Sequence, residues 1–375
     1  MPKIPLVDVK ASYERHRDAI DAAIREVVET TAFIQGPALR EFEAAYARFC
    51  GARHAIGVGS GTAALHLVLH ALGVGPGDVV AVPSHTFIAT AEPVTWLGAT
   101  PRFIEIDPDT GAMDPAALRA GIDGVKVVMP VHIHGRPADL AAICAVAAEA
   151  GVPVVEDAAQ AQGAEIVNPD GTVVRAGSYA EVGCFSFYPG KNLGAFGDAG
   201  AVTTNDDELA ARVRMLRDHG RTTKYEHVMV GYAHRMDTLQ AAVLNAKLPS
   251  LDADNARRRE IAAGYTARLS GVGDLRLLAD PAERVSIYHH YVVRTAHRDA
   301  LLKHLAANGV GAGVHYPIPV HLQPAYAFLG HQRGYLPATE EFADECLSLP
   351  IYAELTDEQM ERVAAEVTAY FSQAA

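Results

Sequence analysis

Short apolar segments alternate with amphipathic ones through much of the first half of the chain. The apolar segments are bounded by Gly, Pro, Asn or Asp, which is typical of strands. They are VVAVP (79–83), PRFIEID (101–107), VKVVMPVHIH (125–134), VPVVED (152–157), CFSFYPG (184–190) and GAVTT (200–204). Apolar spacings of three and four predict helices over 38–50, 63–72, 138–150 and 207–219. This alternation predicts an α/β fold with a mainly parallel sheet flanked by helices.

After about residue 245 the pattern changes. It predicts a long charged helix over 251–269, a strand over 288–294, a helix over 297–309 and a terminal helix over 356–371. We therefore expect a large domain over residues 1–245 and a smaller α+β domain over residues 246–375. The N-terminal segment is a candidate to pack with the smaller domain.

Composition narrows the class of protein. The 375 residues are 49% hydrophobic and 21% charged, which is typical of a globular chain with a sizeable core. A formal charge of −13, without a dense Lys/Arg cluster, argues against nucleic-acid binding. Four separated cysteines without a CxxC pair indicate reduced, mostly buried thiols. Because no apolar run approaches the ~18 residues of a membrane span, we expect a soluble cytoplasmic protein.

A glycine-rich turn, GVGSGT at 57–62, leads directly into a predicted helix. Small residues let backbone N–H groups approach an anion at a helix N-terminus, so this turn is a candidate phosphate site. A purely structural turn remains open, as does a near miss to the GxGxxG dinucleotide fingerprint. That fingerprint requires an acidic residue at the end of the next strand, whereas Asp78 precedes the strand at 79–83.

Two single polar residues follow apolar strands. Asp157 lies at the carboxyl end of its strand, where ligands of open α/β sheets bind, and a carboxylate there can pair with a protonated pyridine nitrogen. A helix cap or a metal ligand remains an open alternative for Asp157. Lys191 lies between an apolar strand and a Gly-rich turn, where a partly desolvated amine suits Schiff-base chemistry. A solvated loop lysine is the alternative.

Taken together, these segments resemble the DegT/DnrJ/StrS family of sugar aminotransferases, which are fold type I pyridoxal-phosphate enzymes of the aspartate aminotransferase superfamily. The resemblance covers nearly the whole chain. Its segments are IPLVDVKASY, GVGSGTAALHL, PSHTFIATAE, VVEDAAQAQGA, CFSFYPGKNLGAFGDAGAV, RMDTLQAAVLNAKL and GVHYPIPVHLQPAY. It implies a seven-stranded type of sheet and a homodimer with its sites at the interface.

Position by position, the resemblance implies roles in binding pyridoxal 5′-phosphate. Lys191 would form the Schiff base and then move the proton. Asp157 would pair with the pyridine nitrogen, and Gln160 would bond the ring hydroxyl. Phe87 would stack on the ring, with core packing as its alternative. The phosphate would be held by Ser60, Gly61, Thr62 and Ser186.

One departure from the family pattern concerns this phosphate. Relatives commonly have G-[YF]-N-x-R-[LM] where this chain has GYAHRM at 231–236. That asparagine reaches across the dimer to the neighbouring subunit's cofactor phosphate, which Ala233 cannot do. Either His234 or water replaces it, or the phosphate is held less fully.

The Pro-rich segment GVHYPIPVHLQPAY would lie near the sugar nucleotide. Its candidate substrate contacts are His315, Tyr316 and His321, each with a structural role as the alternative. His132 and His134 alternate along a predicted strand, but no third ligand lies nearby in sequence, so we expect no metal site.

The resemblance implies a ping-pong transfer of an amino group from an amino acid, expected to be L-glutamate, to a keto-deoxysugar linked to a nucleoside diphosphate. The sequence around Lys191 favours the branch that acts on dTDP-3-keto-6-deoxyhexoses, as in antibiotic or polysaccharide biosynthesis. Amination at C4 of a dTDP- or UDP-4-keto-6-deoxyhexose stays open, as does a non-catalytic regulatory protein that binds the cofactor or a sugar nucleotide. Lys191 argues against a lysine-free sugar dehydratase, and Asp78 against an NAD-dependent oxidoreductase.

Overall fold

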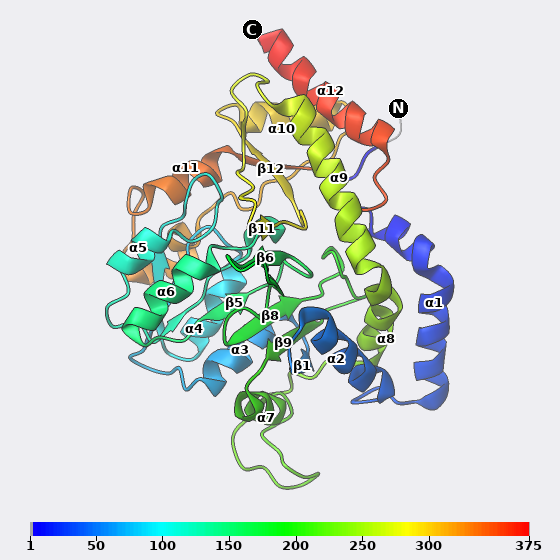
Figure 1. The fold of residues 1–375 in the computed structure, drawn as a ribbon, viewed down its shortest axis with the longest axis vertical. Coiled ribbons are helices and arrows are strands. Elements are labelled where there is room, and N and C mark those ends of the chain that lie inside the picture. The colour runs from blue at the N-terminus through cyan, green and yellow to red at the C-terminus, as the bar shows by residue number, and fades with distance from the viewer. Residues whose placement is uncertain (1–2, 375) are drawn as a thin grey trace.

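A sheet of mainly parallel strands forms the centre of the protein (Figure 1). The computed structural model describes residues 3–374. Its strands form two hydrogen-bonded groups, in the orders β1-β9-β8-β5 and β3-β2-β4. Parallel bridges between Val128 and Val154 and between Val131 and Asp157 join the two groups. The strands are β1 (His54–Val58), β2 (Val79–Pro83), β3 (Thr100–Ile104), β4 (Val127–Val128), β5 (Val155–Asp157), β8 (Val182–Ser186) and β9 (Gly200–Thr204).

The joined groups make one seven-stranded sheet within residues 3–374, in which β9 runs antiparallel to both of its neighbours. The remaining pairs, from β3 to β8, are parallel, so these strands end at the same edge of the sheet. The predicted α/β fold with a mainly parallel sheet is confirmed.

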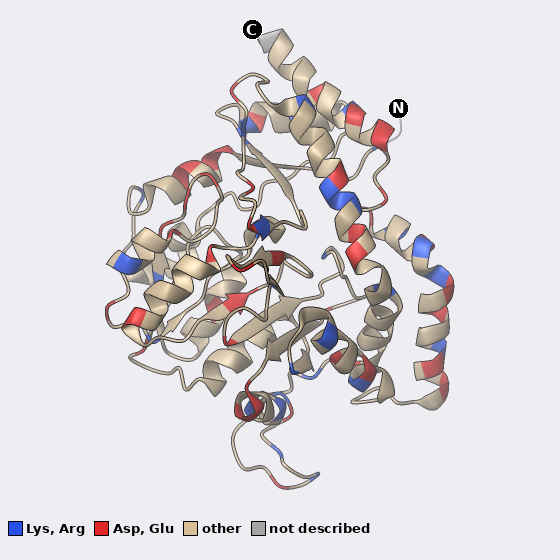
Figure 2. Ribbon diagram, in the orientation of Figure 1, with Lys and Arg blue, Asp and Glu red and all other residues tan. Residues whose placement is uncertain are grey.

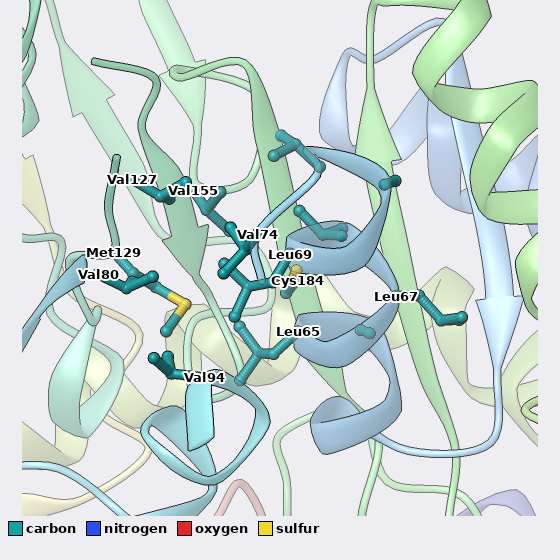
Figure 3. Packing of buried hydrophobic residues seen from close by; sticks show 14 of the residues in the cluster. Leu65, Leu67, Leu69, Val74, Val80, Val94, Val127, Met129, Val155 and Cys184 are labelled. Carbon is teal, nitrogen blue, oxygen red and sulfur yellow. The ribbon is translucent and has the colours of Figure 1, made fainter. Parts of the chain in front are cut away.

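Helices cover both faces of the sheet because side chains alternate between the faces along each strand. On β8, Val182 and Cys184 pack in one core cluster with α3 and α7, whereas Phe185 packs in another with α2 and α8. Figure 3 shows Leu65 and Leu69 of α3 beside Val155 and Cys184. The helices of this half are α1 (Val9–Thr30), α2 (Pro37–Cys50), α3 (Gly61–Ala71), α4 (Glu92–Trp96), α5 (Pro115–Ala120), α6 (Leu140–Ala150), α7 (Asp207–Leu216) and α8 (Thr238–Lys247).

The C-terminal half has its own antiparallel sheet, in the order β10-β12-β13, and its own apolar core cluster. Ile4, near the N-terminus, belongs to that cluster and forms a bridge with Val310. The division at residues 245/246 itself stays a prediction. The elements are α9 (Leu251–Leu269), β10 (Arg276–Leu277), β12 (Tyr291–Arg294), α10 (Arg298–Ala307), α11 (Pro337–Glu345), β13 (Cys346–Leu349) and α12 (Asp357–Ala374).

Shorter elements connect these layers. A small antiparallel sheet, in the order β11-β6-β7, is formed by β6 (Glu165–Val167), β7 (Val173–Arg175) and β11 (Arg284–Val285). The short 3-10 helices are η1 (Ile88–Thr90), η2 (Ile133–Gly135), η3 (Leu248–Ser250), η4 (Val320–Leu322) and η5 (Pro324–Leu329).

Some predicted boundaries differ from those observed. The predictions over 79–83, 200–204 and 251–269 coincide with β2, β9 and α9. The segment 125–134, predicted to be one strand, instead contains the two-residue β4 and the turn η2, where His134 has a φ of 60°. That left-handed conformation ends an extended strand.

Charged residues lie mainly on the outer helices, and the few near the centre include acidic positions on β5 and the charged positions of β6 and β11 (Figure 2). Cys50, Cys184 and Cys346 are buried free thiols, and Cys144 is partly buried. Within residues 3–374, every helix is too short or too polar to cross a membrane.

Candidate active site

A cavity of about 610 Å³ lies beside the edge where the parallel strands end. This is the usual place for a ligand in an open α/β sheet, and the volume suits a small molecule. The structure brings nearly all of the predicted site residues to its wall: Ser60, Gly61, Thr62, Phe87, Asp157, Gln160, Ser186, Lys191, His315 and Tyr316.

Lys191 follows β8 in a tight turn, in which its backbone N–H donates to the carbonyl of Tyr188 at 2.8 Å. The side chain of Asn192 anchors the same turn by donating to Asn255 and to the carbonyl of Ile287. Burial lowers the pKa of the Lys191 amine to about 8, although the negative charge of Asp157 opposes this shift. A substantial fraction of this amine is therefore neutral near pH 8, as a nucleophile must be.

Asp157 ends β5 and is 3% exposed. Burial raises the pKa of its carboxyl group, and two hydrogen bonds oppose that shift. The Thr90 hydroxyl donates to Oδ2 at 2.8 Å, and the N–H of Ala159 donates to Oδ1 at 3.1 Å. The Lys191 amine also favours the charged carboxylate. Each oxygen keeps a second lone pair, so the carboxylate can still accept a hydrogen bond from a protonated ring nitrogen.

The glycine-rich turn forms the beginning of α3. The Ser60 hydroxyl caps the helix by accepting from the N–H of Ala63 at 3.0 Å. Gly61 lies so close to β8 that a Cβ there would be 2.7 Å from Cβ of Ser186. The first N–H groups of a helix lack partners within the helix and carry partial positive charge, so this cradle suits a phosphate.

Gln160 already has two protein partners. Its Oε1 accepts from the N–H of His134 at 2.7 Å, and its Nε2 donates to the hydroxyl of Tyr316 at 3.1 Å. One amide hydrogen remains for a ligand. Phe87 is 53% exposed, with its ring centroid 5.6 Å from that of Tyr316. The alternative of core packing for Phe87 is therefore wrong.

The two histidines of the Pro-rich segment differ in position. His315 lines the cavity, where its Nδ1 contacts the hydroxyl of Ser348 at 2.9 Å. His321 does not line it and is 1% exposed. Ser84 and Glu340 contact the two ring nitrogens of His321 at 2.6 and 3.2 Å. Because both nitrogens are used inside the protein, the expected direct substrate contact of His321 is not supported, and its structural alternative fits.

The side chains of His132 and His134 are not arranged to bind a metal ion together. The ring of His132 lies between Glu156, at 2.9 Å, and the N–H of Ala138, at 3.0 Å. Among residues 3–374, no group of three or more His, Cys, Asp or Glu side chains could hold a metal ion.

Sequence reasoning missed several polar residues of the cavity wall. Thr86 and Thr90 are joined by a hydroxyl–hydroxyl contact of 2.8 Å that leads to Asp157. Their spacing of four residues beside Phe87 was the available signal. The sequence pattern predicts only a strand for His289 and His290, yet both line the cavity. Two adjacent histidines before an apolar strand were the signal there.

These groups fit pyridoxal 5′-phosphate. The buried carboxylate of Asp157 can pair with the ring nitrogen, and the free amide hydrogen of Gln160 can bond the ring hydroxyl. The start of α3 can hold the phosphate. The amine of Lys191 matches the aldehyde that a Schiff base requires.

Comparisons with known proteins agree with this geometry. The model of the DegT/DnrJ/EryC1/StrS aminotransferase family matches residues 14–368. The dTDP-3-amino-3,4,6-trideoxy-alpha-D-glucose transaminase of Streptomyces venezuelae is 46% identical over 96% of this chain and 94% of that protein. The UDP-N-acetyl-3-dehydro-alpha-D-glucosamine 3-aminotransferase of Acidithiobacillus ferrooxidans is 43% identical over 96% of each chain.

Solved structures resemble the whole chain. DesV of S. venezuelae, solved in complex with a ketimine intermediate, has a TM-score of 0.96 and 44% identity, with 99% of both chains covered. The PLP form of Spr1654 of Streptococcus pneumoniae has a TM-score of 0.90 and 25% identity, covering 100% of this chain and 99% of that one.

Proposed function

The chain belongs to the DegT/DnrJ/EryC1/StrS aminotransferase family and is a pyridoxal-phosphate-dependent aminotransferase of nucleotide sugars, and from this premise we propose that it aminates a dTDP-linked 3-keto-6-deoxyhexose with L-glutamate as donor. The observation that carries the proposal is one cavity that holds an amine, a carboxylate and a helix N-terminus in the arrangement that the cofactor needs.

Lys191 would anchor the cofactor and move the proton of the reacting carbon. The bound cofactor supplies an electron sink for that carbon. With a pKa of about 8, the amine both gives up and accepts a proton near neutral pH. The hydrogen bonds from Thr90 and Ala159 favour the charged form of Asp157, which would hold the proton of the ring nitrogen in place.

The remaining cavity residues hold and orient the ligand. Ser60, Gly61, Thr62 and Ser186 would hold the phosphate, Phe87 would stack on the ring, and Gln160 would donate to the ring hydroxyl. His315 and Tyr316 lie on the same wall and would contact the sugar nucleotide. Burial lowers the pKa of His315 to about 4, so this ring is neutral when it does so.

The dTDP-3-keto assignment is supported by the S. venezuelae relative, whose name specifies a dTDP-linked 3-amino sugar. The A. ferrooxidans relative, at 43% identity, is named for a UDP-linked substrate that is aminated at C3. Both names specify C3 rather than C4, but they differ in the nucleotide. A substrate panel must therefore vary the nucleotide as well as the keto position.

We also propose a homodimer. The segment between α7 and α8 projects from the body of the subunit (Figure 1). It carries apolar side chains in solvent: Tyr225 is 81% exposed, Val228 55% and Val230 85%. A projecting apolar loop of this kind is typical of a surface that a second subunit covers. Val230→Glu should shift the mass measured by light scattering toward the monomer, whereas Val173→Glu, at a position exposed to 55% on β7, should not.

The test of the catalytic proposal is an absorbance spectrum. A visible cofactor band should be fixed by borohydride in wild type but not in Lys191→Ala, and should bleach when glutamate is added. The return of the visible band should then be followed after addition of 3-keto and 4-keto sugars linked to dTDP or UDP. Return with the dTDP-3-keto sugar supports the proposal, and preference for a 4-keto sugar replaces it with C4 amination. If no amino acid bleached the cofactor band, the result would favour the non-catalytic regulatory alternative.

A further inference from the structure

Three histidines from separate segments form a line from the protein interior to the cavity. His85 follows β2, His134 lies in η2, and His290 immediately precedes β12. Nε2 of His85 is 3.4 Å from Nε2 of His134, and Nδ1 of His134 is 3.3 Å from Nδ1 of His290. His85 and His134 are 1% and 0% exposed, and His290 lines the cavity.

All three rings are neutral at physiological pH. Burial lowers the pKa of His85 to about 3, with Arg294 and His315 as further causes. Burial also lowers the pKa of His134 and of His290 well below the ordinary value. A neutral imidazole has one N–H donor and one acceptor nitrogen. The line therefore contains three protons on six nitrogens.

Only two arrangements of these protons make both contacts hydrogen bonds. In the first, each proton points away from the cavity, and Nδ1 of His85 carries the last one. Among residues 3–374, that buried nitrogen has no hydrogen-bond partner. In the second, the protons point toward the cavity, and Nδ1 of His85 is a bare acceptor. A buried N–H without a partner is rare and costly, so the second arrangement is favoured.

The second arrangement fixes the tautomer of each ring. His85 donates from Nε2 to Nε2 of His134, and His134 donates from Nδ1 to Nδ1 of His290. The proton of His290 must then be on Nε2. Within the described residues, this nitrogen has no protein partner, and its ring stacks on that of His315 at 3.9 Å. It is left for a ligand.

We infer that His290 is a substrate-binding residue with a fixed Nε2–H donor, and that His134 and His85 are positioning residues that fix it. The inference rests on the proposed function. The acceptor is the keto oxygen on the reacting carbon, because His290 lines the same cavity as Lys191, whose charge is one of the causes that lower the pKa of His290. A protonated amine has only N–H donors, so this edge binds the keto substrate and disfavours the amino product.

The proton positions can be measured without any activity. Neutron diffraction from deuterium-exchanged crystals of the cofactor-bound enzyme should show deuterium on Nε2 of His85, Nδ1 of His134 and Nε2 of His290. In His134→Phe, the deuterium of His290 should divide between its two nitrogens. Deuterium on Nδ1 of His290 in wild type would overturn the inference, whatever the enzyme's substrate.

The two half-reactions test the role of the donor. His290→Leu should raise the KM for the keto-sugar about tenfold, as the loss of one hydrogen bond does. The bleaching rate with glutamate should stay within about twofold of wild type. His290→Gln, which keeps an N–H donor, should recover most of the loss, and His304→Leu, outside the cavity, should behave as wild type. If His290→Leu slowed both half-reactions equally, or slowed neither, the proposed role of His290 as a substrate donor would be overturned.

These results separate failure of the inference from failure of the proposed function. If wild type bleaches with glutamate but accepts no keto-sugar, the proposed substrate is wrong, and the deuterium positions still decide the tautomers. If wild type accepts the sugar and His290→Leu accepts it equally well, the inference fails alone.

Discussion

The Asp157 carboxylate and the Lys191 amine line one cavity, and each shifts the proton equilibrium of the other. The charge of Asp157 raises the pKa of Lys191 against burial, and the charge of Lys191 lowers the pKa of Asp157 against burial. This mutual effect lets two charged groups share a largely buried space.

Removal of the Asp157 charge should therefore lower the pKa of Lys191 further. In the cofactor-free protein, labelling of Lys191 by an amine-reactive reagent, followed by mass spectrometry of its peptide, should give a midpoint near pH 8. Asp157→Asn should move that midpoint to lower pH, because burial then acts without opposition. Asp198→Asn is the control, since that exposed carboxylate lines the same cavity. An unchanged midpoint in Asp157→Asn would contradict the coupling.

The lowered pKa of Lys191 also predicts how stability depends on pH. The folded protein releases this proton near pH 8, whereas the unfolded chain keeps it until about 10.5. Between those values the unfolded state binds more protons, so the unfolding free energy of the cofactor-free protein rises with pH. Lys191 contributes no more than about 3.4 kcal/mol to this rise, and less where water enters the cavity.

Urea unfolding of wild type and Lys191→Met at pH 8 and pH 10 isolates this contribution. The rise in the unfolding free energy from pH 8 to pH 10 should be smaller in Lys191→Met than in wild type. Lys247, whose pKa burial also lowers to about 8, contributes equally to both proteins and cancels. A steeper rise in Lys191→Met would show that the sign is wrong.

Local patterns in the sequence predicted the sheet and singled out Asp157 and Lys191, which line the cavity. Strand β9 and helix α9 coincide with their predicted ranges because each is a continuous periodic segment with clear ends. Asp157 and Lys191 were identifiable since polar residues at the ends of apolar strands are conspicuous. The long helix α1 was not predicted, and its exposed surface explains why: few of its residues are buried, among them Ile20 and Val27.

The sequence could not show which distant segments contact one another. His321 lies within the same Pro-rich segment as His315, yet its ring meets Ser84 and Glu340 rather than the cavity. His85, His134 and His290 are far apart along the chain, so no local pattern reveals that they touch. Burial and pairing of such polar residues are decided by tertiary packing.

Gly61→Ala should distort the phosphate cradle. The added Cβ would lie 2.7 Å from Cβ of Ser186, so either α3 or β8 must move. Overpacking of this kind costs about 1–3 kcal/mol, and we also expect weaker binding of pyridoxal phosphate. Thermal unfolding and cofactor titration measure the two effects. Gly75→Ala, where nothing lies within 4 Å of the new Cβ, should change neither. Equal behaviour of both variants would show that the close approach is not needed.

Ala233→Asn should tighten cofactor binding. Ala233 is exposed on the segment that leads back from the projecting loop to α8, and the ring of its neighbour His234 is occupied by His66 at 3.3 Å and by Tyr232. His234 is therefore poorly placed to replace the missing amide. A new amide donor to the phosphate of the neighbouring subunit should lower the dissociation constant of the cofactor about tenfold. Titration of the cofactor-free protein with pyridoxal phosphate, followed by the visible band, measures this constant. Ala233→Leu adds bulk without a donor and should give no gain. If the asparagine variant gave none either, this position would not face the partner's phosphate, and the proposed dimer would need another arrangement.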